Sequence, residues 1–372
     1  MELVSTRTRA RLAATLAVAA VIGGAASVAT GDPAGAGTPK PAKVVQASVA
    51  GTSYDYGCAT KSDHTVWCRH GNPSSPTQWT GFSQAVSVSV GGSGGQTYLC
   101  ALNLDQTVSC AGDNSFGQLG VNNVAASGTP ITVPGINDAV EVKAGLSTTC
   151  AVRSSGAVSC WGFGPLTGNG LPISTVMPPG DVPGISTATH VAMSASDVCV
   201  LLANGSLECW GDNHSGQLGP NALFGGDYTP QAIPNLVGVQ QIANAGGWQC
   251  ALHASAVSCW GDNYYGQLGQ VVNDQSSQAN PLPIALPAVK QIALGASGGC
   301  ALTKKGDVYC WGSSFWATPA TPWKVSGLPK LQSLLTSVGY NGTCALTKAR
   351  KVLCWGAPGN LFVSTTPTDQ GF

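Results

Sequence analysis

The sequence predicts an all-β fold, a seven-bladed β-propeller built from seven repeats, and three observations lead to it. Forty-nine glycines and 23 prolines among 372 residues disfavour long helices, because these two residues are the poorest helix formers. Fourteen cysteines fall into seven pairs spaced along the chain. A period of about 40–50 residues indicates a solenoid, a propeller or an array.

The cysteine pairs define the repeat. Their members lie ten residues apart, or nine in the fifth pair, and successive first cysteines are 42, 50, 49, 51, 50 and 44 residues apart. The pairs are Cys58 with Cys68, Cys100 with Cys110, Cys150 with Cys160, Cys199 with Cys209, Cys250 with Cys259, Cys300 with Cys310, and Cys344 with Cys354.

Each pair is flanked by further short β segments. Alternating apolar segments such as residues 140–145 and 289–295 precede the first cysteine, and proline-flanked segments such as 129–136 and 321–328 follow the second. Four short strands per repeat, separated by turn residues, are typical of a propeller blade.

Hairpin geometry predicts one disulfide within each repeat. In the sixth repeat a turn centred on 304–306 places Cys300 opposite Cys310, and the nine-residue spacing of the fifth pair keeps Cys250 opposite Cys259. Cysteines that face each other at a non-hydrogen-bonded site are close enough for a disulfide. Zinc ligands usually come in closer pairs, so we expect seven hairpin disulfides and no metal or other cofactor.

The N-terminus predicts export. Arg7, Arg9 and Arg11 precede the apolar run 12–21, and small residues follow, which is the order of a secretory signal peptide. We expect residues 1–29 to be the signal peptide, with cleavage after Ala29 or else Ala36. The alternative is a retained membrane anchor, but the run is short for a span of about 20 residues.

The remaining chain is expected to hold a flexible linker, residues 30–43, and the propeller, residues 44–372. No other apolar segment approaches the length of a membrane span. Removal of residues 1–29 leaves 14 basic and 16 acidic residues and no basic run, whereas nucleic-acid binders need a basic face. We therefore expect a secreted monomer that binds no nucleic acid.

Around the cysteines the repeat resembles that of the regulator of chromosome condensation family. Cys-Trp-Gly occurs at 160–162, 209–211, 259–261, 310–312 and 354–356, and Gly-Gln-Leu-Gly occurs at 117–120, 216–219 and 266–269. The first repeat departs from this pattern, with Trp67 before its second cysteine, and the second has Ala111 in place of the tryptophan.

The resemblance implies a propeller that binds proteins. Cystine staples in every repeat are similar to those of secreted bacterial members, among which a β-lactamase inhibitory propeller uses aromatic loops on one face. The nuclear exchange activity of the family's founder is not expected of an exported chain. Fold similarity alone does not identify a target.

Several motifs have structural explanations. The tryptophans and Gly-Gln-Leu-Gly turns recur with the repeat, so we expect them to pack between blades. The sequence 91–95 matches Gly-x-Ser-x-Gly but lies in a predicted hairpin loop, not in a strand-to-helix turn. Each Gly-Asp-Asn segment offers one carboxylate, fewer than the six to eight oxygens that calcium takes, and the histidines are scattered.

Residues that vary between repeats are the better binding candidates, because aromatic side chains are favoured at binding hot spots. Two loops per blade should open on one face, one before the first cysteine and one after Trp-Gly. Their candidates are Tyr54, Tyr56, Tyr98, Phe116, His214, Trp248, Tyr264, Tyr265, Phe315, Trp316 and Tyr340.

These candidates predict an extracellular protein partner and no catalysis, and a glycan or cell-wall ligand is the alternative. An extracellular hydrolase is a third hypothesis, which a pair of acids near the central channel would favour. Alanine at Trp248 or Tyr265 is expected to weaken binding about thirtyfold with little change in melting temperature.

Overall fold

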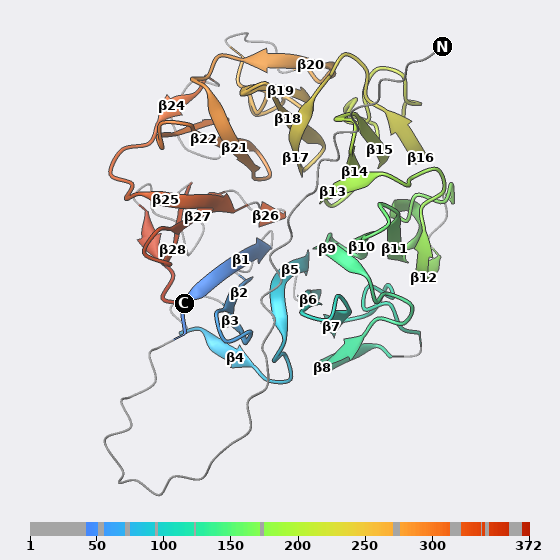
Figure 1. Ribbon diagram of the computed structural model, residues 1–372. Coiled ribbons are helices and arrows are strands. Elements are labelled where there is room, and N and C mark those ends of the chain that lie inside the picture. Colours follow the sequence, from blue (N-terminus) through green and yellow to red (C-terminus); the bar gives the residue numbers. More distant parts are fainter. Residues whose placement is uncertain are drawn as a thin grey trace, which may run out of the picture. The chain divides into compact units, whose positions relative to one another are not determined.

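The computed structural model divides the chain into residues 1–41 and a compact unit formed by Ala42–Phe372. Seven sheets of this unit, each with four antiparallel strands, are arranged as blades around a centre (Figure 1), which confirms the seven-bladed propeller. Everything below refers to the described residues, which are 42–50, 56–70, 75–93, 96–122, 124–171, 175–270, 276–312, 321–335, 337–338, 342–356 and 367–372.

The first four blades follow the chain in order. Blade 1 contains β1 (Val44–Ala50), β2 (Tyr56–Lys61), β3 (Val66–His70) and β4 (Thr77–Trp79). Blade 2 contains β5 (Ala85–Ser93), β6 (Gln96–Asn103), β7 (Val108–Asp113) and β8 (Ala126–Thr132). Blade 3 contains β9 (Ala139–Ala144), β10 (Thr148–Arg153), β11 (Val158–Phe163) and β12 (Val176–Asp181), with the 3-10 helix η1 (Gly164–Leu166) before its last strand. Blade 4 contains β13 (Ala188–Met193), β14 (Asp197–Leu202), β15 (Leu207–Gly211) and β16 (Asp227–Ala232).

The last three blades repeat this order. Blade 5 contains β17 (Val239–Ala245), β18 (Trp248–His253), β19 (Ala256–Gly261) and β20 (Gln278–Ile284). Blade 6 contains β21 (Val289–Leu294), β22 (Gly298–Thr303), β23 (Val308–Gly312) and β24 (Trp323–Lys324). Blade 7 contains β25 (Leu331–Leu335), β27 (Gly342–Thr347), β28 (Val352–Gly356) and β29 (Thr368–Asp369), and β26 (Ser337–Val338) pairs with β1 of blade 1.

The second and third strands of every blade are joined by the predicted disulfide. In all seven bridges the Cα atoms of the two cysteines are 4.0–4.1 Å apart, and the described residues include no free cysteine. The bridges join Cys58 to Cys68, Cys100 to Cys110, Cys150 to Cys160, Cys199 to Cys209, Cys250 to Cys259, Cys300 to Cys310, and Cys344 to Cys354.

The strand register explains why every bridge lies within one blade. Cys300 stands directly opposite Cys310, and Cys250 stands opposite Cys259 despite the shorter spacing, as the hairpin argument requires. The same cross-strand pairing recurs in the other five blades. Disulfides persist in oxidising compartments, so this chain folds in one.

Antiparallel pairing gives the propeller two different faces. The connections from first to second strand and from third to fourth strand leave the same end of a sheet, because neighbouring strands run in opposite directions. We call this the loop face. The opposite face, the turn face, carries the short turns between the second and third strands. These turns span four residues in six blades and two residues in blade 5.

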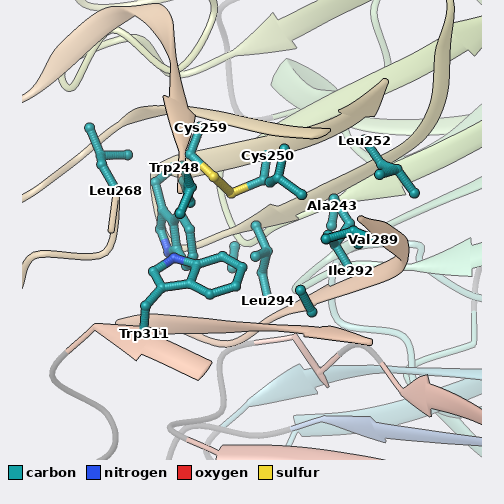
Figure 2. Close-up of a cluster of buried hydrophobic side chains, with 14 residues drawn as sticks. Ala243, Trp248, Cys250, Leu252, Cys259, Leu268, Val289, Ile292, Leu294 and Trp311 are labelled. Atoms are coloured by element: carbon teal, nitrogen blue, oxygen red, sulfur yellow. A yellow bond between two sulfur atoms is a disulfide. The ribbon is translucent and has the colours of Figure 1, made fainter. Parts of the chain in front are cut away.

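The hydrophobic core is distributed between the blades. Each of seven buried clusters combines residues from two neighbouring blades, and one of them joins blades 5 and 6 (Figure 2). In that cluster the Cys250–Cys259 disulfide lies with Trp248 of blade 5 and Trp311 of blade 6. The disulfides therefore staple the hairpins whose side chains fill the interblade cores.

The ring closes between blades 7 and 1. A buried cluster joins Val44 and Ala59 of blade 1 to Leu346 of blade 7. The Arg69 guanidinium also donates to the Gln370 side-chain oxygen at 2.8 Å. The two ends of the described chain are thus held together by packing and by a hydrogen bond.

The N-terminal predictions lie almost entirely outside the described residues. The signal peptide, residues 1–29, and all of the linker except Ala42 and Lys43 belong to this part of the chain. In the remainder, no helix is both long enough and apolar enough to cross a membrane.

Candidate functional site

The long loops of blades 2, 4 and 5 share one internal frame, built from Asp-Asn-x-x-Gly-Gln-Leu-Gly. In blade 4 the Gln217 amide donates to Asp212 at 2.7 Å and its oxygen accepts the Ser215 N–H at 2.9 Å. The Asn213 side chain accepts the Leu218 N–H at 2.9 Å and donates to the loop's later carbonyls. Side-chain hydrogen bonds of this kind hold a loop without regular secondary structure.

Blades 2 and 5 repeat the same bonds. The equivalent glutamine, Gln118 or Gln267, donates to the aspartate at 2.6 and 2.8 Å. The equivalent asparagine accepts the leucine N–H at 2.8 and 3.1 Å. The Gly-Asp-Asn segments are therefore loop braces, and the described residues contain no cluster of three or more side chains able to hold a metal.

The frames are anchored to the following blade by the repeated tryptophans. Trp260 of blade 5 donates its indole N–H to the Gln217 carbonyl of blade 4 at 2.9 Å. Trp161 and Trp311 make the equivalent bonds to Gln118 and Gln267 at 2.9 and 2.8 Å. All three tryptophans are fully buried, which confirms that they are scaffold residues.

Each frame projects two variable residues, which we call the tip residues. They are Ser115 and Phe116 in blade 2, His214 and Ser215 in blade 4, and Tyr264 and Tyr265 in blade 5. The exposed fractions of Phe116, Tyr264 and Tyr265 are 39%, 59% and 52%. His214 is also exposed and pairs through Nδ1 with Asp212. These four predicted candidates do lie on the surface.

Sequence analysis missed three apolar side chains beside the tips. Phe224 is 84% exposed and follows Leu223, which is also exposed. The ring centroids of Phe224 and His214 are 5.5 Å apart. Phe163 of blade 3 packs edge-to-face on Phe116 with centroids 5.7 Å apart. Phe224 follows the Gly-Gln-Leu-Gly motif in an irregular segment, and Phe163 replaces the frame's aspartate, so neither belongs to the recurring pattern.

Charge on these loops has one sign. Residues 113–125, 163–175, 212–226 and 262–277 contain no lysine or arginine, whereas Asp113, Asp212 and Asp262 recur in the frames. The aromatic tips therefore lie in an acidic setting.

Three predicted binding residues are buried, and for them the expected surface position is wrong. Tyr56 is 3% exposed, and Tyr98 and Trp248 are inaccessible to solvent. Each stands two residues before the first cysteine, at the start of the blade's second strand, and packs in an interblade cluster. The loop before the first cysteine is short, so this residue belongs to the strand.

Four further candidates lie outside the described residues. They are Tyr54, Phe315, Trp316 and Tyr340.

The centre of the ring contains a separate cavity of about 340 Å³, lined by polar and apolar residues, nearly all of them from the innermost strands. Glu141 ion-pairs with Lys143 at 3.2 Å, accepts the Val191 N–H at 2.9 Å and lies 3.5 Å from His190. Burial raises the pKa of the Glu141 carboxyl, but these partners outweigh it and bring the pKa to about 2. Glu141 is the one carboxylate among the described residues that line the cavity. The described lining therefore does not contain the pair of acidic residues that would favour a hydrolase.

Comparison with known proteins supports the fold assignment. The Regulator of chromosome condensation (RCC1) repeat matches residues 289–315, which cover the recurring part of the sixth repeat. Prp20p of Saccharomyces cerevisiae has a TM-score of 0.67 and 21% identity, with 79% of this chain and 80% of that chain covered. This chain has the fold of an RCC1-type propeller.

Other solved propellers are similar at the level of the fold. Human WBSCR16 gives a TM-score of 0.66 at 21% identity, covering 80% of this chain and 85% of its own chain. The ectodomain of the Arabidopsis thaliana receptor kinase ACR4 gives 0.53 at 19% identity, covering 88% and 100%. A comparison with curated protein sequences finds no match.

Proposed function

We propose that this RCC1-type propeller is an exported scaffold that binds a protein partner through the aromatic tips of its loop face. One observation carries the proposal. Frames of identical construction on blades 2, 4 and 5 present different exposed side chains, namely Phe116, His214 and the Tyr264–Tyr265 pair. An asymmetric partner needs different contacts from each blade, and aromatic residues with little rotamer freedom favour binding.

The chemistry of the loops also indicates the kind of partner. Exposed apolar groups such as Phe224 and Leu223 stand beside the tips, and exposed apolar patches mark interaction sites. Because the surrounding loops carry aspartates and no lysine or arginine, the complementary surface is apolar with a basic rim. Among structurally similar propellers, Prp20p, the yeast RCC1, has binding properties to Gsp1p and histones and has been crystallised with Kap60.

Export is part of the same proposal. Seven disulfides require an oxidising compartment, and the N-terminal arginines followed by an apolar run support a signal peptide. N-terminal sequencing of the exported protein should begin near Thr30. Finding Met1 or Glu2 there would contradict cleavage.

The binding proposal is tested by capture from the culture fluid of the producing organism. The purified wild-type protein and the variant Tyr264→Ser/Tyr265→Ser serve as parallel baits, and captured proteins are identified by mass spectrometry. We expect a protein retained by the wild type to be lost from the variant. With that purified partner, Tyr265→Ala alone should weaken affinity about thirtyfold, the loss typical of a hot-spot residue.

Leu104→Ser is the matched control, because Leu104 is an exposed apolar residue on the turn face. It should retain the partner as the wild type does. Equal capture by the tyrosine variant would show that the loop face of blade 5 is not used. Binding of purified glycans instead of protein, lost in the same variant, would establish the glycan alternative for the same face.

A further inference from the structure

The near-neutral net charge of the chain conceals two oppositely charged halves of the ring. Residues 42–80 and 285–372, which form blades 6, 7 and 1, contain eleven lysines and arginines against four aspartates. Residues 81–284, which form blades 2 to 5, contain two basic and eleven acidic residues. Blades 6, 7 and 1 are consecutive around the ring, since buried clusters join 6 to 7 and 7 to 1 (Figure 1).

Most of the basic side chains of this sector lie on the turn face. The turns between second and third strands carry Lys304, Lys305, Lys348, Arg350 and Lys351, while Lys43, Lys290 and Lys330 stand at the beginning of the innermost strands. We call these eight residues the basic patch. The seven lysines are exposed and Arg350 is partly exposed.

Backbone contacts show that the two groups of basic residues are neighbours. The Lys304 N–H bonds to the carbonyl of Ala288, two residues before Lys290, at 2.8 Å. The Lys348 N–H bonds to the Lys330 carbonyl at 3.0 Å. The innermost strands therefore begin beside the turns, and the patch is continuous within each blade.

Contacts between blades 7 and 1 extend the patch across the ring closure. The Arg350 guanidinium donates to the Val44 carbonyl of blade 1 at 3.4 Å, beside Lys43. Lys324, which lies outside the patch, pairs with Asp307 at 2.9 Å, whereas Asp369 offsets Lys351 of the patch itself at 2.7 Å. The blade 1 turn adds the exposed Asp63, but the eight basic residues still outnumber these three aspartates, so the patch keeps a net positive charge.

The shape and composition of the patch restrict its partner. Its turns have the same four-residue length in blades 6, 7 and 1, so none of the three is extended into a long loop, which suits a flat partner. Among the described residues of these blades, no large apolar side chain is exposed. Single-stranded nucleic acid is bound by aromatic side chains that stack on the bases, which this patch does not offer. Anionic lipid headgroups attract exposed lysines by charge alone.

We propose that the basic patch docks the propeller peripherally on an anionic phospholipid surface. Docking through the turn face leaves the loop face directed away from the lipid, because the two faces are opposite ends of the same sheets. The propeller would then present its aromatic tips from a membrane surface. The lipid contact is independent of the partner proposed for the loop face.

Vesicle co-sedimentation of the purified, disulfide-bonded protein tests the proposal. Vesicles of phosphatidylcholine mixed with phosphatidylglycerol should bind the protein, and vesicles of phosphatidylcholine alone should not. Binding should be lost as ionic strength rises from about 0.05 to 0.5 M, because screening shortens the reach of surface charges. Lys304→Gln/Lys348→Gln should weaken the partition about thirtyfold, since each basic residue near the surface contributes about a factor of five.

A matched control changes the same turn position in the acidic half of the ring. Leu104 and Ala203 occupy in blades 2 and 4 the place of Lys304 and Lys348, and Leu104→Glu/Ala203→Glu lowers the net charge by the same two units. This control should bind the mixed vesicles nearly as the wild type does. Equal weakening in both variants would mean that net charge alone acts, and the patch would be rejected.

Two further outcomes would overturn the lipid proposal. Salt-sensitive sedimentation without vesicles would show that the basic half binds the acidic half of another copy. Tighter binding to double-stranded DNA than to the mixed vesicles, lost in the lysine variant, would assign the patch to nucleic acid. Neither result would affect the partner test on the loop face.

Discussion

Two positions of the repeat bring variable side chains to the loop-face end of the blades, and they behave differently. The entry position, two residues before the first cysteine of each pair, is occupied by Tyr56, Tyr98, Thr148, Asp197, Trp248, Gly298 and Gly342. The side chains of Tyr98, Asp197 and Trp248 reach the next blade, and the five non-glycine residues at this position are all buried. The tip positions, only 16 residues further along in blade 5, are exposed.

The difference shows that variation between repeats has two causes. At the entry position each residue must fit the neighbouring blade. Trp248 donates to the Ala296 carbonyl of blade 6 at 3.2 Å, and Tyr98 donates to the Thr148 carbonyl of blade 3 at 2.8 Å. At the tips of blade 5 the demand is weaker, because the recurring frame bonds to the backbone of Tyr264 and Tyr265 and not to their side chains. Variable residues at the start of a strand therefore adjust packing, whereas the exposed side chains at the tips of the frames leave room for another role.

The largest effect is expected at Trp248. Trp248→Ala would leave a cavity against Trp311 and the Cys250–Cys259 disulfide (Figure 2), and such truncations cost about 3–5 kcal/mol. Chemical denaturation under non-reducing conditions should show this loss in the free energy of unfolding. The expectation that this variant affects binding alone is thus corrected. A variant as stable as the wild type would show that Trp248 is not part of the interblade core.

Asp197 is the entry residue of blade 4, and its effect should depend on pH. This buried carboxylate accepts the side-chain amides of Asn244 and Gln249 from blade 5 at 2.8 and 2.9 Å, and Ser194 also donates to it. Burial, opposed by these hydrogen bonds, raises its pKa from 3.8 to about 6. The folded state therefore holds the proton more tightly than the unfolded state.

Asp197 contributes on the order of 2–3 kcal/mol to the free energy of unfolding when it is protonated. This contribution is fully present below about pH 4 and is lost as the pH rises through about 6. Asp197→Asn should remove that part of the pH dependence, because an amide does not titrate. Its oxygen can still accept from Asn244 and Gln249, so the fold should be kept. The measurement is the difference in unfolding free energy between the two proteins across this pH range. A constant difference would contradict a raised pKa.

The fold could be predicted because its determinants are local in sequence. Cys300 and Cys310 face each other through a short turn, and the same register recurs in every repeat. Four strands then follow from the alternating segments on either side. The pairing of β1 with β26 and the Arg69–Gln370 bond at ring closure join distant parts of the chain, and no local pattern reveals them.

The candidate site could be predicted only in part. Phe116, His214, Tyr264 and Tyr265 were found because they interrupt a recurring motif. Burial at the entry position depends on a blade about 50 residues away, which explains why Trp248 was misassigned. The basic patch combines residues from both ends of the chain, so a search for basic runs and the net charge both missed it.

Tyr98→Phe should have a smaller effect than the changes above. The ring stays in place, but the hydroxyl no longer donates to the Thr148 carbonyl or accepts from Thr149 at 3.2 Å. Loss of one partner of a buried hydrogen bond costs about 1–2 kcal/mol. Thermal and chemical denaturation would measure it, with Tyr264→Phe as the matched control. If Tyr98→Phe were as stable as Tyr264→Phe, the Tyr98 hydroxyl would not contribute to the contacts between blades 2 and 3.

The smallest change in stability is expected at the tips. Tyr264 and Tyr265 contact each other edge-to-face with ring centroids 4.9 Å apart. The frame beneath them bonds only to their backbone. The Tyr265 N–H donates to the Gln267 side chain at 2.7 Å, and the Tyr264 N–H donates to the Asp262 side chain at 3.0 Å. Alanine preserves both bonds, so Tyr264→Ala and Tyr265→Ala should each alter the unfolding free energy by less than about 0.5 kcal/mol. Gln267→Ala, which removes the brace itself, is the opposing control and should be clearly less stable. If the tyrosine variants were destabilised as much as Gln267→Ala, the tips would be structural residues like those of the entry position, and a binding role would lose its support.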